Sequence, residues 1–151
     1  MGYSIIQVYC FANKNIIDSL HVACNRVHRS LQGVSRYSSV KSLYTTYNTL
    51  PISLLGNLYI SKFIYRSLNQ NGQLSLHNAT CKLFQLNCAC HDYPTRISFT
   101  NHLYKKSNKA FLSSYVNKCC SMWNVIPVNI RNSSSSKTFV SSYKNYLLEK
   151  W

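Results

Sequence analysis

Apolar residues recur at steps of three and four positions in several stretches of the chain, a spacing that predicts amphipathic helices. The clearest stretch covers residues 13–32, where an asparagine at position 13 or 15 can cap the start and Gly33 can close the end. Its apolar stripe consists of Ile16, Leu20, Ala23, Val27 and Leu31. The pattern therefore predicts an N-terminal helix with one apolar face.

Two further helices are predicted in the first half of the chain. Residues 40–47 form the shorter one, after a loop at residues 33–39. The longer one covers residues 51–68, with Pro51 at a position that the first helical turn tolerates. Because its apolar positions are spread broadly around the helix, we expect it at the centre of the core.

The second half predicts two more helices, separated by the serine linker at residues 133–136. The first begins at Ser113 or Ser114, and the second carries an apolar stripe and continues to the end of the chain. Trp123 and Phe139 are expected as buried anchors of these helices. The apolar positions of the two helices are Val116, Cys119, Cys120 and Trp123, then Phe139, Tyr143, Tyr146 and Leu147.

These elements predict a mainly α fold, with about five helices packed orthogonally and a short irregular or β segment near residues 93–111. The length of 151 residues fits one ordinary domain. We therefore expect a single basic helical domain over residues 1–151, in which residues 1–12 are either disordered or non-native.

The net charge of the chain indicates the kind of partner that it binds. The chain has 17 Lys and Arg against 3 Asp and Glu, a formal net charge of +14. Such a surface repels itself unless a polyanion screens it. The candidate partners are RNA, DNA or an anionic membrane, and the basic surface favours the phosphate backbone of nucleic acid. No stretch is apolar enough to span a bilayer. The alternative is a compositional bias of an AT-rich genome, since Asn, Lys, Tyr, Ile and Ser are all abundant.

The scarcity of acids argues against an enzyme. Asp18, Asp92 and Glu149 lie far apart in the sequence. Two-metal nucleases and polymerases need clustered carboxylates, and glycosidases need a carboxylate pair. The chain also lacks a nucleophile elbow, a Walker loop and a dinucleotide-binding glycine motif. The prediction is a protein with no catalytic residue, no cofactor and no metal.

The seven cysteines are irregularly spaced and follow no export signal, which predicts reduced thiols and a cytoplasmic or nuclear location. One group merits a test as a zinc site, namely Cys81, Cys88, Cys90 and His91. The single residue between Cys88 and Cys90 is too short for an ordinary zinc knuckle, whose ligand pairs are spaced by two to four residues. Zinc is therefore the weaker interpretation of this group.

The candidate nucleic-acid site is basic. Arg96, Lys105, Lys106 and Lys109 fall in the least regular part of the chain, where binding loops are common. Arg26 and Arg29 form a second patch near the end of the first helix, although the helix dipole alone also favours cations there. Each is predicted to contact phosphate and to carry little sequence information.

Several ordered motifs resemble one family. The run His91-Asp92-Tyr93-Pro94-Thr95-Arg96 is similar to the H-x-Y-x-T-R element that follows the thumb of LINE-type (non-LTR) retrotransposon reverse transcriptases. Trp123-Asn124-Val125-Ile126-Pro127, Ile130-Arg131, Ser135, Phe139 and Lys144 resemble the tail that follows it, with Val140 where the lysine after Phe is usual. Residues 25–29, 50–52 and 63–66 resemble the family's preceding segments. The likeness covers roughly residues 15–151.

The resemblance implies a post-thumb segment that supports binding of template RNA or target DNA, with the rest of a reverse transcriptase as a further partner. The catalytic palm motif with its paired aspartates is absent, so polymerase activity is not carried over. Three hypotheses follow: a non-catalytic nucleic-acid-binding segment, an inert retrotransposon remnant without independent function, and a small cysteine-dependent or zinc-dependent protein.

Overall fold

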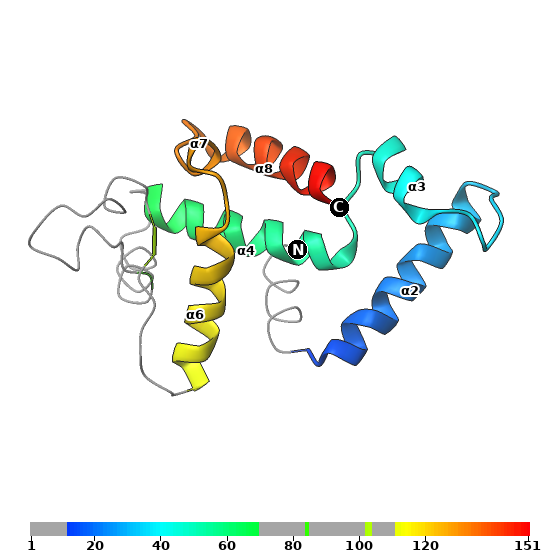
Figure 1. The fold of residues 1–151 in the computed structure, drawn as a ribbon, viewed down its shortest axis with the longest axis horizontal. Coiled ribbons are helices and arrows are strands. Elements are labelled where there is room, and N and C mark those ends of the chain that lie inside the picture. The colour runs from blue at the N-terminus through cyan, green and yellow to red at the C-terminus, as the bar shows by residue number, and fades with distance from the viewer. Residues whose placement is uncertain (1–11, 70–83, 85–101, 104–110) are drawn as a thin grey trace, which may run out of the picture. The chain divides into compact units, whose positions relative to one another are not determined.

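A computed structural model describes residues 12–69, 84, 102–103 and 111–151 (Figure 1). Helices dominate the described residues, which confirms the predicted mainly α fold. They are α2 (Lys14–Leu31), α3 (Val40–Thr46), α4 (Ile52–Asn69), α6 (Phe111–Asn124), α7 (Val128–Arg131) and α8 (Ser136–Lys150). Of the segment predicted to be irregular or β, residues 93–101 and 104–110 lie outside the described part, and Phe111 begins α6.

The chain divides into two compact units. The first consists of Met1–Tyr59 and Lys144–Trp151, and the second of Ile60–Tyr143. Helices α4 and α8 each contribute residues to both units. The single domain expected over residues 1–151 stays a prediction.

In the first unit, α2 and α3 are joined by a turn over residues 32–39 (Figure 1). Gly33 lies in the left-handed region with φ +60°, and its amide donates to Ser30 O while the Val34 amide donates to Arg29 O. This pair of bonds is the Schellman arrangement, which satisfies carbonyls at a helix end and favours glycine at the left-handed position. The predicted closing role of Gly33 is thereby confirmed.

Tyr44 on α3 organises the packing of this unit. Its ring is buried, and its hydroxyl donates a 2.8 Å hydrogen bond to Oδ1 of Asn25 on α2. His28 and Trp151 both contact the ring edge-on, with centroid separations of 4.8 and 5.1 Å. Burial, with a further contribution from Cys24, raises the pKa of the Tyr44 hydroxyl, against an opposing effect of Arg29. Helix α2 therefore meets α3 through polar and aromatic side chains.

The apolar stripe of α2 has a different environment from that of the other helices. No residue of α2 is buried, and Ile16, Leu20, Val27 and Leu31 are exposed. The reason is geometric, because Asn25 and His28, which contact Tyr44 of α3, lie on a different side of the helix from the stripe. The predicted helix is present, but its apolar face is not part of the core.

The second unit has an aromatic core. Phe139 of α8 is fully buried and stacks on Tyr65 of α4 at 4.5 Å and on Trp123 of α6 at 5.8 Å. Such ring pairs add about 0.5–1.5 kcal/mol beyond the area they bury. The predicted anchors Trp123 and Phe139 are confirmed. So is the predicted face of α6, because Val116, Cys119, Cys120 and Trp123 are all buried.

Short connections fix the path from α6 to α8. Pro127 lies before α7, and its carbonyl accepts bonds from the amides of Ile130 and Arg131. Ser135 then caps α8, since its hydroxyl accepts a 3.1 Å bond from the Thr138 amide. The serine linker thus supplies the predicted cap. The Tyr65 hydroxyl donates to Ser133 O and ties this linker to α4.

Candidate nucleic-acid interface

Sequence reasoning predicted six basic site residues in two patches, and the structure describes the smaller patch. Arg26 and Arg29 lie three residues apart in the last turns of α2. Arg26 is exposed, whereas Arg29 is half-buried. The larger patch, with Arg96, Lys105, Lys106 and Lys109, lies outside the described residues and stays a prediction.

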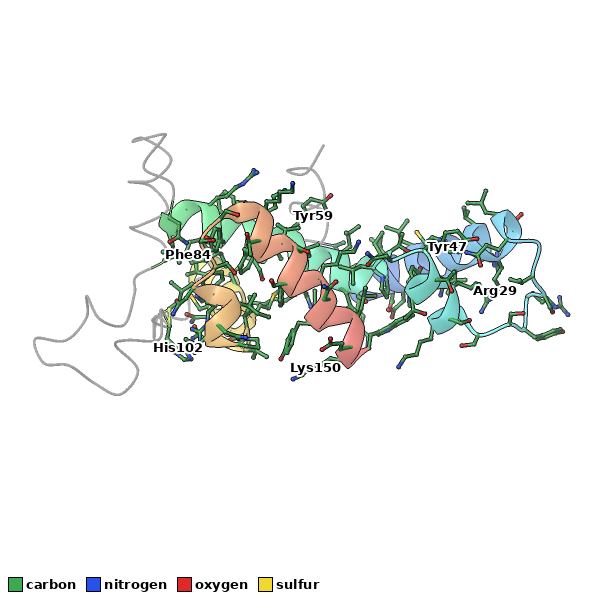
Figure 2. All side chains as sticks on the ribbon, turned by 90° about the horizontal axis from the view of Figure 1, so that it is seen from above. Arg29, Tyr47, Tyr59, Phe84, His102 and Lys150 are labelled. Carbon is green, nitrogen blue, oxygen red and sulfur yellow. The ribbon has the colours of Figure 1, made fainter. Side chains whose placement is uncertain are left out.

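Arg29 has a defined structural contact. Its Nε donates a 3.1 Å hydrogen bond to Ser38 O, across the turn between α2 and α3. The Arg29 side chain is labelled in Figure 2. A hydrogen bond from a charged guanidinium to a carbonyl oxygen is stronger than one from a neutral donor. Arg29 therefore holds the turn closed, in addition to any contact it makes with phosphate.

The turn and the start of α3 bring further basic and aromatic side chains to the same end of the helix pair. Arg36 and Tyr37 lie in the turn, and Lys41 lies in the first turn of α3. All three side chains are exposed. We call the set of Arg26, Arg29, Arg36, Tyr37 and Lys41 the basic turn cluster.

The stretch of sequence that forms the basic turn cluster is free of acidic residues. No Asp or Glu occurs anywhere between Asp18 and Asp92, a span that includes the whole cluster. Neighbouring cations without carboxylates raise the local positive potential, which attracts anions. The arrangement can therefore hold phosphates through charge and hydrogen bonds.

Sequence reasoning assigned none of Arg36, Tyr37 and Lys41 to the candidate site. Lys41 is twelve or more positions from the two α2 arginines, so spacing along one helix gives no signal. The available signal was Gly33, because a glycine that closes one helix shortly before another begins brings the two helix ends together.

A second cation has an unusual environment in the other unit. Arg131 is 3% exposed, and within the described residues its Nε and Nη1 have no hydrogen-bond partner. Burial lowers the pKa of this guanidinium, although an arginine remains charged near neutral pH. Burial lowers the pKa of the His102 imidazole, and the nearby charge of Arg131 lowers it further. His102 is labelled in Figure 2.

The residues that resemble the reverse-transcriptase tail have structural roles in this unit. Trp123, Ile126, Ile130 and Phe139 are buried, and Ser135 caps α8. These residues of the tail thus serve packing and capping in the second unit.

In the part of the chain that the structure describes, no three His, Cys, Asp or Glu side chains gather as they would around a metal ion. Cys24, Cys119 and Cys120 are in no disulfide bond, and the last two are buried in the core as the sequence predicts. The tested zinc group at residues 81–91 lies outside the described residues. No described helix is both long and apolar enough to cross a bilayer.

Comparisons with known proteins give no relative. No family model, no curated protein and no solved structure matches the chain.

Proposed function

We propose that this chain is a non-catalytic nucleic-acid-binding segment derived from a non-LTR retrotransposon reverse transcriptase. The observation that carries the binding part of the proposal is the basic turn cluster. Its exposed cations lie on one helix pair, in a span of sequence that contains no carboxylate. The origin rests on the ordered motifs of the second half of the sequence.

The ligand is the phosphate backbone of RNA or DNA. Arginine and lysine neutralise phosphates and release condensed counterions, a gain that is independent of sequence and falls as salt rises. Arg26, Arg36 and Lys41 have exposed side chains, so a strand can reach them without unfolding the unit. The rest of a reverse transcriptase is a further partner in this proposal, and the compartment is the cytoplasm or the nucleus.

The test compares two variants that lose the same number of positive charges, one within the basic turn cluster and one outside it. The variant R26Q/R36Q/K41Q loses three cations of the cluster, and K62Q/K118Q/K137Q loses three cations of the other unit. Binding of labelled single-stranded RNA is measured by fluorescence anisotropy at several salt concentrations.

The cluster variant is expected to bind more weakly and to lower the slope of log affinity against log salt by about two units. The control is expected to change both quantities less. Equal losses in the two variants would show that net charge, rather than the cluster, determines binding.

The exposed apolar stripe of α2 favours the second hypothesis, an inert remnant. A helix that exposes five large apolar side chains fits a surface that missing parts of a larger protein once covered. Circular dichroism and limited proteolysis of the isolated chain distinguish a folded nucleic-acid-binding segment from an inert remnant. Rapid cleavage within α2 and α3, with loss of helical signal, supports the remnant.

A further inference from the structure

Tyr37 presents an aromatic ring to solvent in the middle of the basic turn cluster. It is 79% exposed, and the guanidinium carbon of Arg36 lies 4.7 Å from the ring centroid. The Nη2 of Arg36 also donates a hydrogen bond to the Tyr37 hydroxyl. The cation therefore covers part of one ring face, and most of the ring surface remains open to a ligand.

The backbone around this ring is held in place from both sides. The Tyr37 amide donates to the Ser35 hydroxyl at 3.3 Å, and the Ser38 amide donates to Ser35 O at 2.9 Å. Arg29 then fixes Ser38 O, and Gly33 closes α2 before the turn. A ring that is held before binding loses less conformational freedom when a ligand stacks on it.

We infer that Tyr37 is a base-stacking platform and that the ligand of the basic turn cluster is single-stranded nucleic acid. This inference rests on the proposed function and specifies its substrate class. The bases of a duplex are already stacked on each other, whereas those of a single strand can splay onto an aromatic ring. Arg36 beside the ring meets the phosphate that flanks the stacked base, so the two neighbours hold adjacent parts of one nucleotide.

Tyr47 provides a matched control. It is also an exposed tyrosine, at 57%, and it follows α3 in the same unit. No cation lies over its ring among the described contacts, and it is outside the basic turn cluster. Removing its ring thus tests the loss of an exposed tyrosine without the loss of the platform.

The experiment uses the full chain with Tyr37→Ala, Tyr37→Trp and Tyr47→Ala. The probes are a labelled single-stranded RNA, a single-stranded DNA and a duplex DNA, each of about 15 nucleotides or base pairs. Tyr37→Ala is expected to weaken binding of the single strands by about fivefold or more, while Tyr37→Trp retains it. Tyr47→Ala is expected to leave binding of all three probes unchanged.

The duplex separates stacking from charge. Tyr37→Ala should leave its weaker, phosphate-driven binding unchanged, because the substitution removes no cation. The inference is overturned if Tyr37→Ala and Tyr47→Ala have equal effects, or if single strand and duplex lose affinity equally. A wild-type chain that binds the RNA but is indifferent to Tyr37→Ala refutes the platform alone, whereas one that binds no probe refutes the proposed function as well.

Discussion

Asn124 shows how one side chain can hold a residue that is distant in the sequence. Its amide group accepts a 2.9 Å bond from the Leu103 amide and donates a 3.0 Å bond to Leu103 O. A side-chain amide has both a donor and an acceptor, so it can satisfy both backbone groups of one residue. Leu103 is thereby held in the core, where leaving its backbone groups unpaired would cost about 1–3 kcal/mol each.

His102, next to Leu103, makes the stability of the second unit sensitive to pH. Burial and then the charge of Arg131 lower the pKa of its imidazole from the ordinary value of 6.5. A depressed pKa means that the unfolded chain binds the proton more readily than the folded chain does. The stabilisation is therefore complete above about pH 6.5 and is lost as the pH falls through the lower pKa of the folded state.

We accordingly predict that the free energy of unfolding decreases between about pH 7.5 and pH 5.5, and that His102→Gln makes this decrease smaller. Urea denaturation of both proteins, followed by tryptophan fluorescence, measures the difference. Parallel pH profiles for the two proteins would contradict the assignment to His102, whatever the difference in their absolute stability.

At the scale of the helices, the caps can be tested with neighbouring serines. Ser135 accepts from the Thr138 amide and its hydroxyl contacts the Thr138 hydroxyl, whereas the adjacent Ser134 is exposed and does not cap α8. Replacing a capping serine by alanine costs about 1 kcal/mol. We predict that Ser135→Ala lowers the free energy of unfolding by about this amount and that Ser134→Ala changes it by less than about 0.5 kcal/mol.

Chemical denaturation of the two single variants and the wild type gives the comparison directly. Ser134→Ala serves as the control for the loss of an exposed hydroxyl in the same linker. If the two variants were equally destabilised, the capping role of Ser135 would be wrong.

The packing face of a helix was predictable from the sequence where its apolar stripe meets an apolar core. The spacing of Val116, Cys119, Cys120 and Trp123 indicated the buried face of α6, because apolar side chains meet an apolar core there. The spacing on α2 was equally regular but did not indicate which side meets α3. That side is set by the bond from Tyr44 to Asn25, which joins residues far apart in the sequence.

At the scale of the whole molecule, the net charge indicated the kind of ligand more clearly than which residues bind it. The excess of Lys and Arg predicted a polyanionic partner, and the pair Arg26 and Arg29 was predicted from one helix. The contribution of Lys41 depended on a turn that brings two helices together, which no local pattern encodes. The stacking role of Tyr37 likewise depends on exposure, and sequence does not give the exposure of one tyrosine among twelve.

The same excess of charge makes ionic strength the most informative variable. If cations of the folded chain neutralise several phosphates, log affinity falls linearly with log salt, by about 0.7 for each phosphate contacted on a single strand. Loss of binding at high salt and its recovery on dilution would follow from the same electrostatic origin.

The most direct test is therefore the affinity of the wild-type chain for single-stranded RNA across a series of salt concentrations. We predict measurable binding at about 50 mM salt and a log–log slope of magnitude about two or more. Absent binding at that concentration, or an affinity that does not change with salt, would contradict a nucleic-acid-binding role for this chain.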